Sequence, residues 1–122
     1  MAERYSSFSS GSTRWFLQRI SAAFLVVTLA FHFLLLHFYH HAPEITFGGS
    51  AARYSVPAYF VTMVLFLAAA TFHGTNGVYN ALVNQGVTGT PKRVAKWVLI
   101  VAGILVFVQG IRIALTLMGA SA

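Results

Sequence analysis

The chain has 122 residues, of which 57% are hydrophobic and only 8% are charged, and its mean hydropathy is +0.73. Soluble domains carry about 25% charged residues, so this composition excludes an ordinary soluble domain. The net charge of +6 does not predict nucleic-acid binding, because the Lys and Arg residues are separated by long apolar runs. There is no cysteine, which excludes disulfides, thiolate ligands and a cysteine nucleophile.

The N-terminal segment, residues 1–14, is polar and serine-rich and does not resemble a cleaved signal peptide. Three apolar stretches follow, each long enough for a helix that crosses a bilayer, which needs about 20 residues. The predicted membrane helices cover about residues 15–38, 57–82 and 94–118. Pro57 and Pro91 suit the starts of the second and third helices, where a missing N–H is harmless. We therefore predict an all-α integral membrane protein with one domain, residues 1–122.

The charges near the ends of the spans predict the orientation of the chain, because cytoplasmic segments are enriched in Lys and Arg. The N-terminal side of the first span and the 83–93 connection carry most of these residues: Arg4, Arg14, Arg19, Lys92, Arg93 and Lys96. The 41–55 connection has only Arg53, which Glu44 offsets. We expect a cell-membrane protein whose N-terminus and 83–93 connection are cytoplasmic. The 41–55 connection and the C-terminus then lie outside.

A polar stripe runs along one face of the second span. His73, Gly77, Asn80 and Asn84 follow one another at helical spacings and so share this face. Polar groups inside a bilayer are costly, and each is therefore a candidate for a functional role. Gly77 lacks a side chain one turn from His73, which leaves room for a flat, wide group beside the imidazole. The alternative is hydrogen bonding between helices, which would use the small residues but would not need the histidine.

The other two spans also carry polar faces. One face of the first span contains Gln18, Ser21, Leu25, Thr28 and His32. We expect no ligand role for the histidines off this face or at the outer boundary, which are His37, His40 and His41. In the third span, Arg112 lies within the hydrophobic length and needs a partner or water.

His32 and His73 have different predicted depths. At about 1.5 Å per residue, His32 lies roughly 26 Å from the cytoplasmic start of its helix, and His73 roughly 14 Å from the cytoplasmic end of its own. If the flat group beside His73 is a haem, the two axial ligands of its iron lie within about 4–5 Å of each other, because metal–nitrogen bonds are about 2 Å long. Either two haems lie at different depths, or only one of these residues is a ligand. In both cases another chain must supply a second axial ligand.

Two segments of the chain carry a family resemblance. WFLQRISAAFLVVTLAFHFLLLHF and FHGTNGVYNALVNQ resemble the small, D-type cytochrome b membrane-anchor subunits of succinate dehydrogenase, in their archaeal or bacterial forms. The specific features are an Arg–x–Ser/Thr start of the first span, Arg19 and Ser21, and a His–x3–Gly in the second, His73 and Gly77. The resemblance implies half of a six-helix bundle, completed by a second three-helix anchor subunit. An iron–sulfur subunit and an FAD-containing flavoprotein subunit would bind on the cytoplasmic side.

The resemblance also implies roles for individual residues. His73 would be an axial ligand of haem b, and Arg19 and Ser21 would lie near the haem propionates and the quinone. Forms with two haems place a further ligand on the first span, for which His32 is the matching residue. From its position alone, we expect Arg112 to pair with a propionate of such an outer haem.

The quinone site departs from the pattern of many relatives. An Asp–Tyr pair in those relatives, whose tyrosine hydrogen-bonds the quinone, is replaced by Asn84 and Gln85. Both amides donate and accept hydrogen bonds, but they supply neither a phenol nor a carboxylate. We expect them near the quinone, with a proton route and quinone type that this departure leaves open.

The expected function is electron transfer from iron–sulfur clusters to a quinone, with succinate oxidation in the flavoprotein and no activity of this chain alone. One alternative is a haem-free anchor or assembly subunit, and another is the anchor of a fumarate reductase. A small transporter or channel is a third. Against transport, the spans contain no acidic residue and the chain has no inverted repeat.

Overall fold

The computed structural model describes residues 13–120, and this part of the chain contains only helices and their connections. The elements in chain order are α1 (Thr13–Leu34), η1 (Leu35–Tyr39), η2 (Ala42–Glu44), α2 (Phe47–Tyr54), α3 (Pro57–Asn84) and α4 (Gly89–Gly119). The predicted polar segment, residues 1–14, lies outside the described residues except for Thr13 and Arg14, which begin α1.

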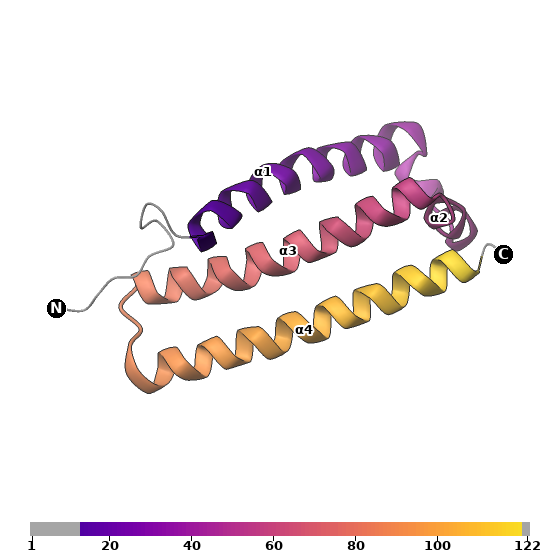
Figure 1. Ribbon diagram of the computed structural model, residues 1–122. Helices are drawn as coiled ribbons and strands as arrows, with labels where there is room; N and C mark the ends of the chain where they lie inside the picture. Colours follow the sequence, from indigo (N-terminus) through magenta and orange to yellow (C-terminus); the bar gives the residue numbers. More distant parts are fainter. Residues whose placement is uncertain (1–12, 121–122) are drawn as a thin grey trace.

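The three long helices lie side by side, with α3 in the middle (Figure 1). α3 packs against α1 on one side and against α4 on the other, and within residues 13–120 the backbones of α1 and α4 do not approach each other. The start of α1 and the connection from α3 to α4 lie at one end of the layer, and α2 lies at the other (Figure 1). A single layer of helices leaves both of its faces uncovered.

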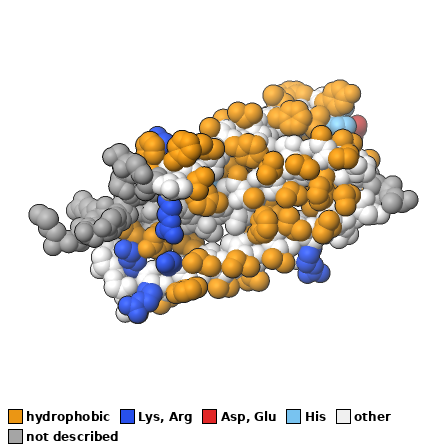
Figure 2. Space-filling view, in the orientation of Figure 1, with side chains coloured by type: hydrophobic (Ala, Val, Ile, Leu, Met, Phe, Trp, Pro, Cys, Tyr) orange, Lys and Arg blue, Asp and Glu red, His pale blue; other side chains and the backbone are white. Residues whose placement is uncertain are grey.

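The uncovered surface is apolar (Figure 2). Large side chains such as Val26, Phe38 and Leu105 are about two-thirds exposed, at 69%, 64% and 65%. The buried set includes polar residues, among them Ser21 and Thr28, which are 7% and 5% exposed. Polar groups inside and apolar groups outside are the arrangement that lipid favours. Each of α1 with η1, α3 and α4 is long and apolar enough to cross a membrane, which agrees with the three predicted spans.

The helices extend beyond the predicted spans. α1 continues through the π-helical turn η1 to Tyr39, and α4 begins at Gly89, within the 83–93 connection. The reason is that hydropathy reports the part of a helix in the bilayer and not the polar turns that continue it into water. The 41–55 connection also contains a helix, α2, which the sequence pattern did not predict. Thr46 caps it, because its Oγ1 accepts a hydrogen bond from the Gly49 N–H at 3.1 Å.

Two glycines set the close approach of α4 to α3. A Cβ atom added to Gly103 would lie 2.9 Å from Thr75 Cγ2, and one added to Gly110 would lie 2.5 Å from Leu67 Cδ2. Small residues at such positions let membrane helices pack closely, which gains van der Waals contact where no hydrophobic effect operates. The contact therefore depends on the missing side chains of α4.

Candidate functional site

His73 lies at the centre of a polar contact between α1 and α3. The side chain is half-buried, and its Nδ1 lies 3.1 Å from the Ser21 hydroxyl oxygen. Ser21 uses its single hydroxyl hydrogen to donate to the Gln18 carbonyl at 3.0 Å. The hydroxyl oxygen must then accept from His73, which puts the ring hydrogen on Nδ1. In this tautomer Nε2 carries a lone pair, which is the form that binds a metal ion.

Gln18 connects the two helices through both ends of its carboxamide. Its Nε2 donates to the His73 carbonyl at 3.2 Å, and its Oε1 accepts from Asn76 Nδ2 at 2.7 Å. A Cβ atom on Gly77 would lie 3.3 Å from Gln18 Nε2, so Gly77 admits this carboxamide close to α3. The sequence pattern put Gln18 on the face of Ser21 but did not predict this role. Gln18 lies three residues before Ser21 and therefore on the same helix face, so a contact with α3 at the level of His73 could have been inferred from the sequence.

The carboxamide of Gln18 yields a stability prediction. In Gln18→Leu, the size of the side chain is nearly kept, but Asn76 Nδ2 loses its acceptor in a partly buried contact. We expect the free energy of unfolding to fall by about 1–3 kcal/mol. Thermal denaturation of the detergent-solubilised protein, followed by circular dichroism, measures the effect. The matched control is Gln109→Leu, since Gln109 is exposed. If the free energy of unfolding falls equally in the two variants, the hydrogen bonds of Gln18 between α1 and α3 do not stabilise the protein more than those of an exposed glutamine.

His32 belongs to a separate cluster near α2. Its Nδ1 lies 3.4 Å from the Tyr59 hydroxyl, and it lines a pocket of about 240 Å³ with Tyr54 and residues of α3 and α4, including Gly110. Burial raises the pKa of the Tyr54 phenol above its ordinary value, so this side chain is neutral at physiological pH. The cluster is therefore a largely apolar cavity with two phenols beside the imidazole.

The two histidines lie further apart than the sequence pattern predicted. His73 is level with its partner Ser21, which lies roughly 16 Å before His32 along α1. In the same way, His32 is level with its partner Tyr59, which lies roughly 21 Å before His73 along α3. The expected gap of roughly 12 Å assumed that the helix ends are level. α3 extends beyond the start of α1 at this end of the layer (Figure 1), which accounts for the difference. The two side chains therefore cannot bind the same haem iron in this arrangement.

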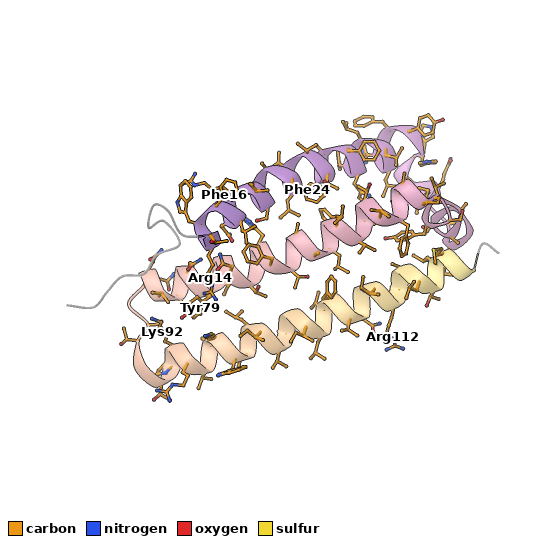
Figure 3. All side chains as sticks on the ribbon, in the orientation of Figure 1. Arg14, Phe16, Phe24, Tyr79, Lys92 and Arg112 are labelled. Atoms are coloured by element: carbon orange, nitrogen blue, oxygen red, sulfur yellow. The ribbon has the colours of Figure 1, made fainter. Side chains whose placement is uncertain are left out.

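The remaining predicted residues do not join the His73 contact. Arg19 is exposed and its guanidinium lies 4.4 Å above the Trp15 ring. Asn84 and Gln85 are exposed at the end of α3. Arg112 is exposed and donates to Gln109 Oε1 at 3.3 Å, with its side chain directed away from α3 (Figure 3).

The site is incomplete within the described chain. Asn80, on the polar stripe of His73, is only 8% exposed, and its Nδ2 has no hydrogen-bond partner among the described residues. Within residues 13–120, no group of three or more His, Cys, Asp or Glu side chains is arranged to hold a metal ion. His73 can thus contribute one nitrogen ligand to a metal ion, and the described residues do not supply a complete set of ligands.

The described pockets are also too small for a large cofactor. The four that we describe have volumes of about 190, 280, 270 and 240 Å³. Sites that enclose a small molecule usually have about 300–1,000 Å³. Taken singly, none of these four pockets encloses a haem-sized or quinone-sized group.

These features define a class of protein: a multi-pass helical membrane protein that presents an oriented histidine on a layer open to a partner. The sequence model of the family described as succinate dehydrogenase/fumarate reductase transmembrane subunit matches residues 2–115, nearly the whole chain. The chain therefore belongs to this family, which confirms the predicted membrane-anchor family. The D type and the archaeal or bacterial form stay predictions. No curated protein and no solved structure gives a significant match to the chain.

Proposed function

We propose that this chain is a D-type membrane anchor of a succinate:quinone oxidoreductase, and that it holds haem b together with a second three-helix anchor subunit. The observation that carries the proposal is the orientation of His73. Its Nδ1–H is bound to Ser21, which leaves the Nε2 lone pair for iron. Metal-binding histidines almost always donate their other ring N–H to a partner of this kind. Membership of the family supplies the setting.

The residues around His73 have distinct parts in this proposal. Ser21 orients the imidazole, and Gln18 holds α1 to the backbone of α3 at the same level. The partner anchor subunit provides the second axial ligand and the walls that this chain lacks. When bound, haem b supplies a one-electron carrier whose potential depends on its axial ligands and surrounding hydrogen bonds.

The quinone site in this proposal lies at the end of the layer where Arg19, Asn84 and Gln85 are found. All three side chains are exposed and are able to donate hydrogen bonds to a quinone carbonyl. Lys and Arg side chains gather at the same end (Figure 2), which supports a cytoplasmic position under the rule for positive charges. The iron–sulfur and flavoprotein subunits would bind there and deliver electrons over a short distance.

A second haem, if the complex carries one, would use His32. This residue lies at the other end of the membrane span and is half-buried beside a cavity, which supports a separate ligand role. Arg112 has less support as a propionate partner of that haem. It extends from α4 away from α3, whereas His32 lies on α1 across the layer (Figure 3).

The proposal predicts the composition and activity of the purified complex. A tag on this chain should isolate a flavoprotein, an iron–sulfur protein and a second small membrane subunit from gently solubilised membranes. The preparation should reduce a quinone when succinate is added. The rate of fumarate reduction by a reduced quinone is measured as well, and comparison of the two rates shows which direction is faster. Untagged membranes taken through the same purification are the control. A chain that purifies without these partners, or without either activity, would contradict the proposal.

A further inference from the structure

A largely apolar pocket with two basic side chains in its lining lies between α3 and α4, at the end of the layer that we assign to the cytoplasmic side. Its volume is about 190 Å³, and its polar lining comes from three helices: Arg14 of α1, Thr75, Asn76 and Tyr79 of α3, and Lys96 of α4. Arg14 and Tyr79 lie at this same end of the layer in Figure 3. The pocket does not include His73 or Ser21, but it adjoins the His73 contact, because Asn76 lines it and also donates to Gln18.

Among the described residues, no negative charge balances this pocket. Arg14 and Lys96 bring two positive charges, and no carboxylate lines the pocket. Within residues 13–120 the only acidic side chain is Glu44, which lies in η2 at the opposite end of the molecule. Arg14 and Lys96 are both exposed and stay hydrated, but two like charges beside one pocket repel each other, and an anion between them offsets this repulsion. The pocket is therefore suited to an anionic group.

An apolar groove continues from the pocket along α3 and α4. The groove has a volume of about 280 Å³, and it shares Thr75, Leu99 and Ile100 with the pocket that Arg14 and Lys96 line. From there it runs along α4 past Gly103 to Phe107, towards the middle of the span. A molecule with a charged head and a long apolar tail would place its head at the basic residues of the pocket and its tail along the groove.

We propose that the pocket binds an anionic phospholipid of the cytoplasmic leaflet. Its phosphate lies between Arg14 and Lys96, where the Tyr79 hydroxyl can donate a further hydrogen bond, and one acyl chain follows the groove past Gly103. Basic pockets between membrane helices on the cytoplasmic side bind anionic headgroups in this manner. A neutral quinone has the same general shape, but it leaves both cations unpaired. The charge therefore favours the lipid.

The test compares lipid retention by the intact complex. Wild type, Arg14→Gln/Lys96→Gln and the matched control Lys92→Gln/Arg93→Gln are purified through this chain and washed in detergent. Native mass spectrometry then measures retained phosphatidylglycerol after exposure to mixed phosphatidylglycerol and phosphatidylcholine. We expect affinity for phosphatidylglycerol to fall about 30-fold in the first variant, since each cation near the surface contributes about fivefold. The control removes the same charge from the same end of α4, outside the pocket, and should retain the lipid.

Further arms keep the result interpretable if a variant folds poorly. The charge-preserving variant Arg14→Lys/Lys96→Arg should bind phosphatidylglycerol as wild type does. Displacement of the lipid by millimolar inorganic phosphate would instead indicate a site for a soluble anion. Loss of co-purified quinone with unchanged lipid would indicate a quinone pocket, and equal lipid loss in the Lys92→Gln/Arg93→Gln control would indicate general surface charge. Each of these three results would overturn the proposal, and none of the readouts depends on haem or on succinate oxidation.

Discussion

Replacement of His73 by alanine is expected to abolish the b-type α-band in the reduced-minus-oxidised spectrum of the purified complex, or to halve it if two haems are present. The physical reason is the loss of the Nε2 lone pair that the Ser21 contact leaves available. A haem that keeps only the axial ligand from the partner would bind weakly and change its spin state. The measurement is a dithionite-reduced minus oxidised spectrum, normalised to flavin content, with wild type and variant prepared side by side.

Two further variants separate ligation from general damage to α1 and α3. His37→Ala is the control, because His37 is exposed and stacks on Phe33 with ring centres 5.0 Å apart. It should leave the spectrum unchanged. Ser21→Ala should keep the band but weaken haem affinity by about 10–100-fold, because the outer partner of a metal-binding histidine is lost.

The different spectra have different meanings. An unchanged band in His73→Ala would refute the ligand role and leave His73 as a hydrogen-bonding residue between helices. A wild-type complex without a band would favour the haem-free anchor. A halved band would make His32→Ala the next variant, since His32 lies at a separate depth with its own cavity.

The contact between α3 and α4 should be the most sensitive packing site in the described chain. In Gly110→Val, the first added carbon would overlap Leu67, whose Cδ2 would lie only 2.5 Å away, and the branched carbons need still more space. The end of the Leu67 side chain can move to relieve part of this overlap, so we expect the free energy of unfolding to fall by about 1–3 kcal/mol, the range for an overpacked core. Thermal unfolding of the solubilised protein, followed by circular dichroism, gives the change in midpoint.

A rescue variant tests whether Leu67 is the cause. Gly110→Val/Leu67→Ala removes the overlapping side chain and should recover more than half of the lost stability, because directly contacting residues are not additive. Gly119→Val, in the same helix, has no atom within 4 Å of the added Cβ and should change stability by less than about 1 kcal/mol. Similar losses at Gly110 and Gly119 would show that α3 and α4 are not held this closely.

Local patterns in the chain predicted the type and number of its membrane helices and the residues that share the polar face of α1. Each apolar run has the length of a bilayer crossing, and a run can be recognised without knowing what it contacts. Ser21 and Thr28, which share a face by helical spacing, are both buried against the layer. The α2 helix was missed because eight residues with two glycines have no such strong pattern.

The site depended on relationships that no local pattern carries. Ser21 and His73 are 52 positions apart, and their pairing requires a particular rotation and level of α1 against α3. Helical periodicity gives the rotation of each helix about its own axis but not the height at which two helices meet, so the separation of His32 from His73 was underestimated. The pocket of Arg14, Tyr79 and Lys96 combines three helices in the same way. By itself the sequence determined which segments are long and apolar enough to lie in the bilayer and which of their residues share a helix face. Only the tertiary structure decided which polar groups meet, because that depends on close packing between residues far apart in the chain.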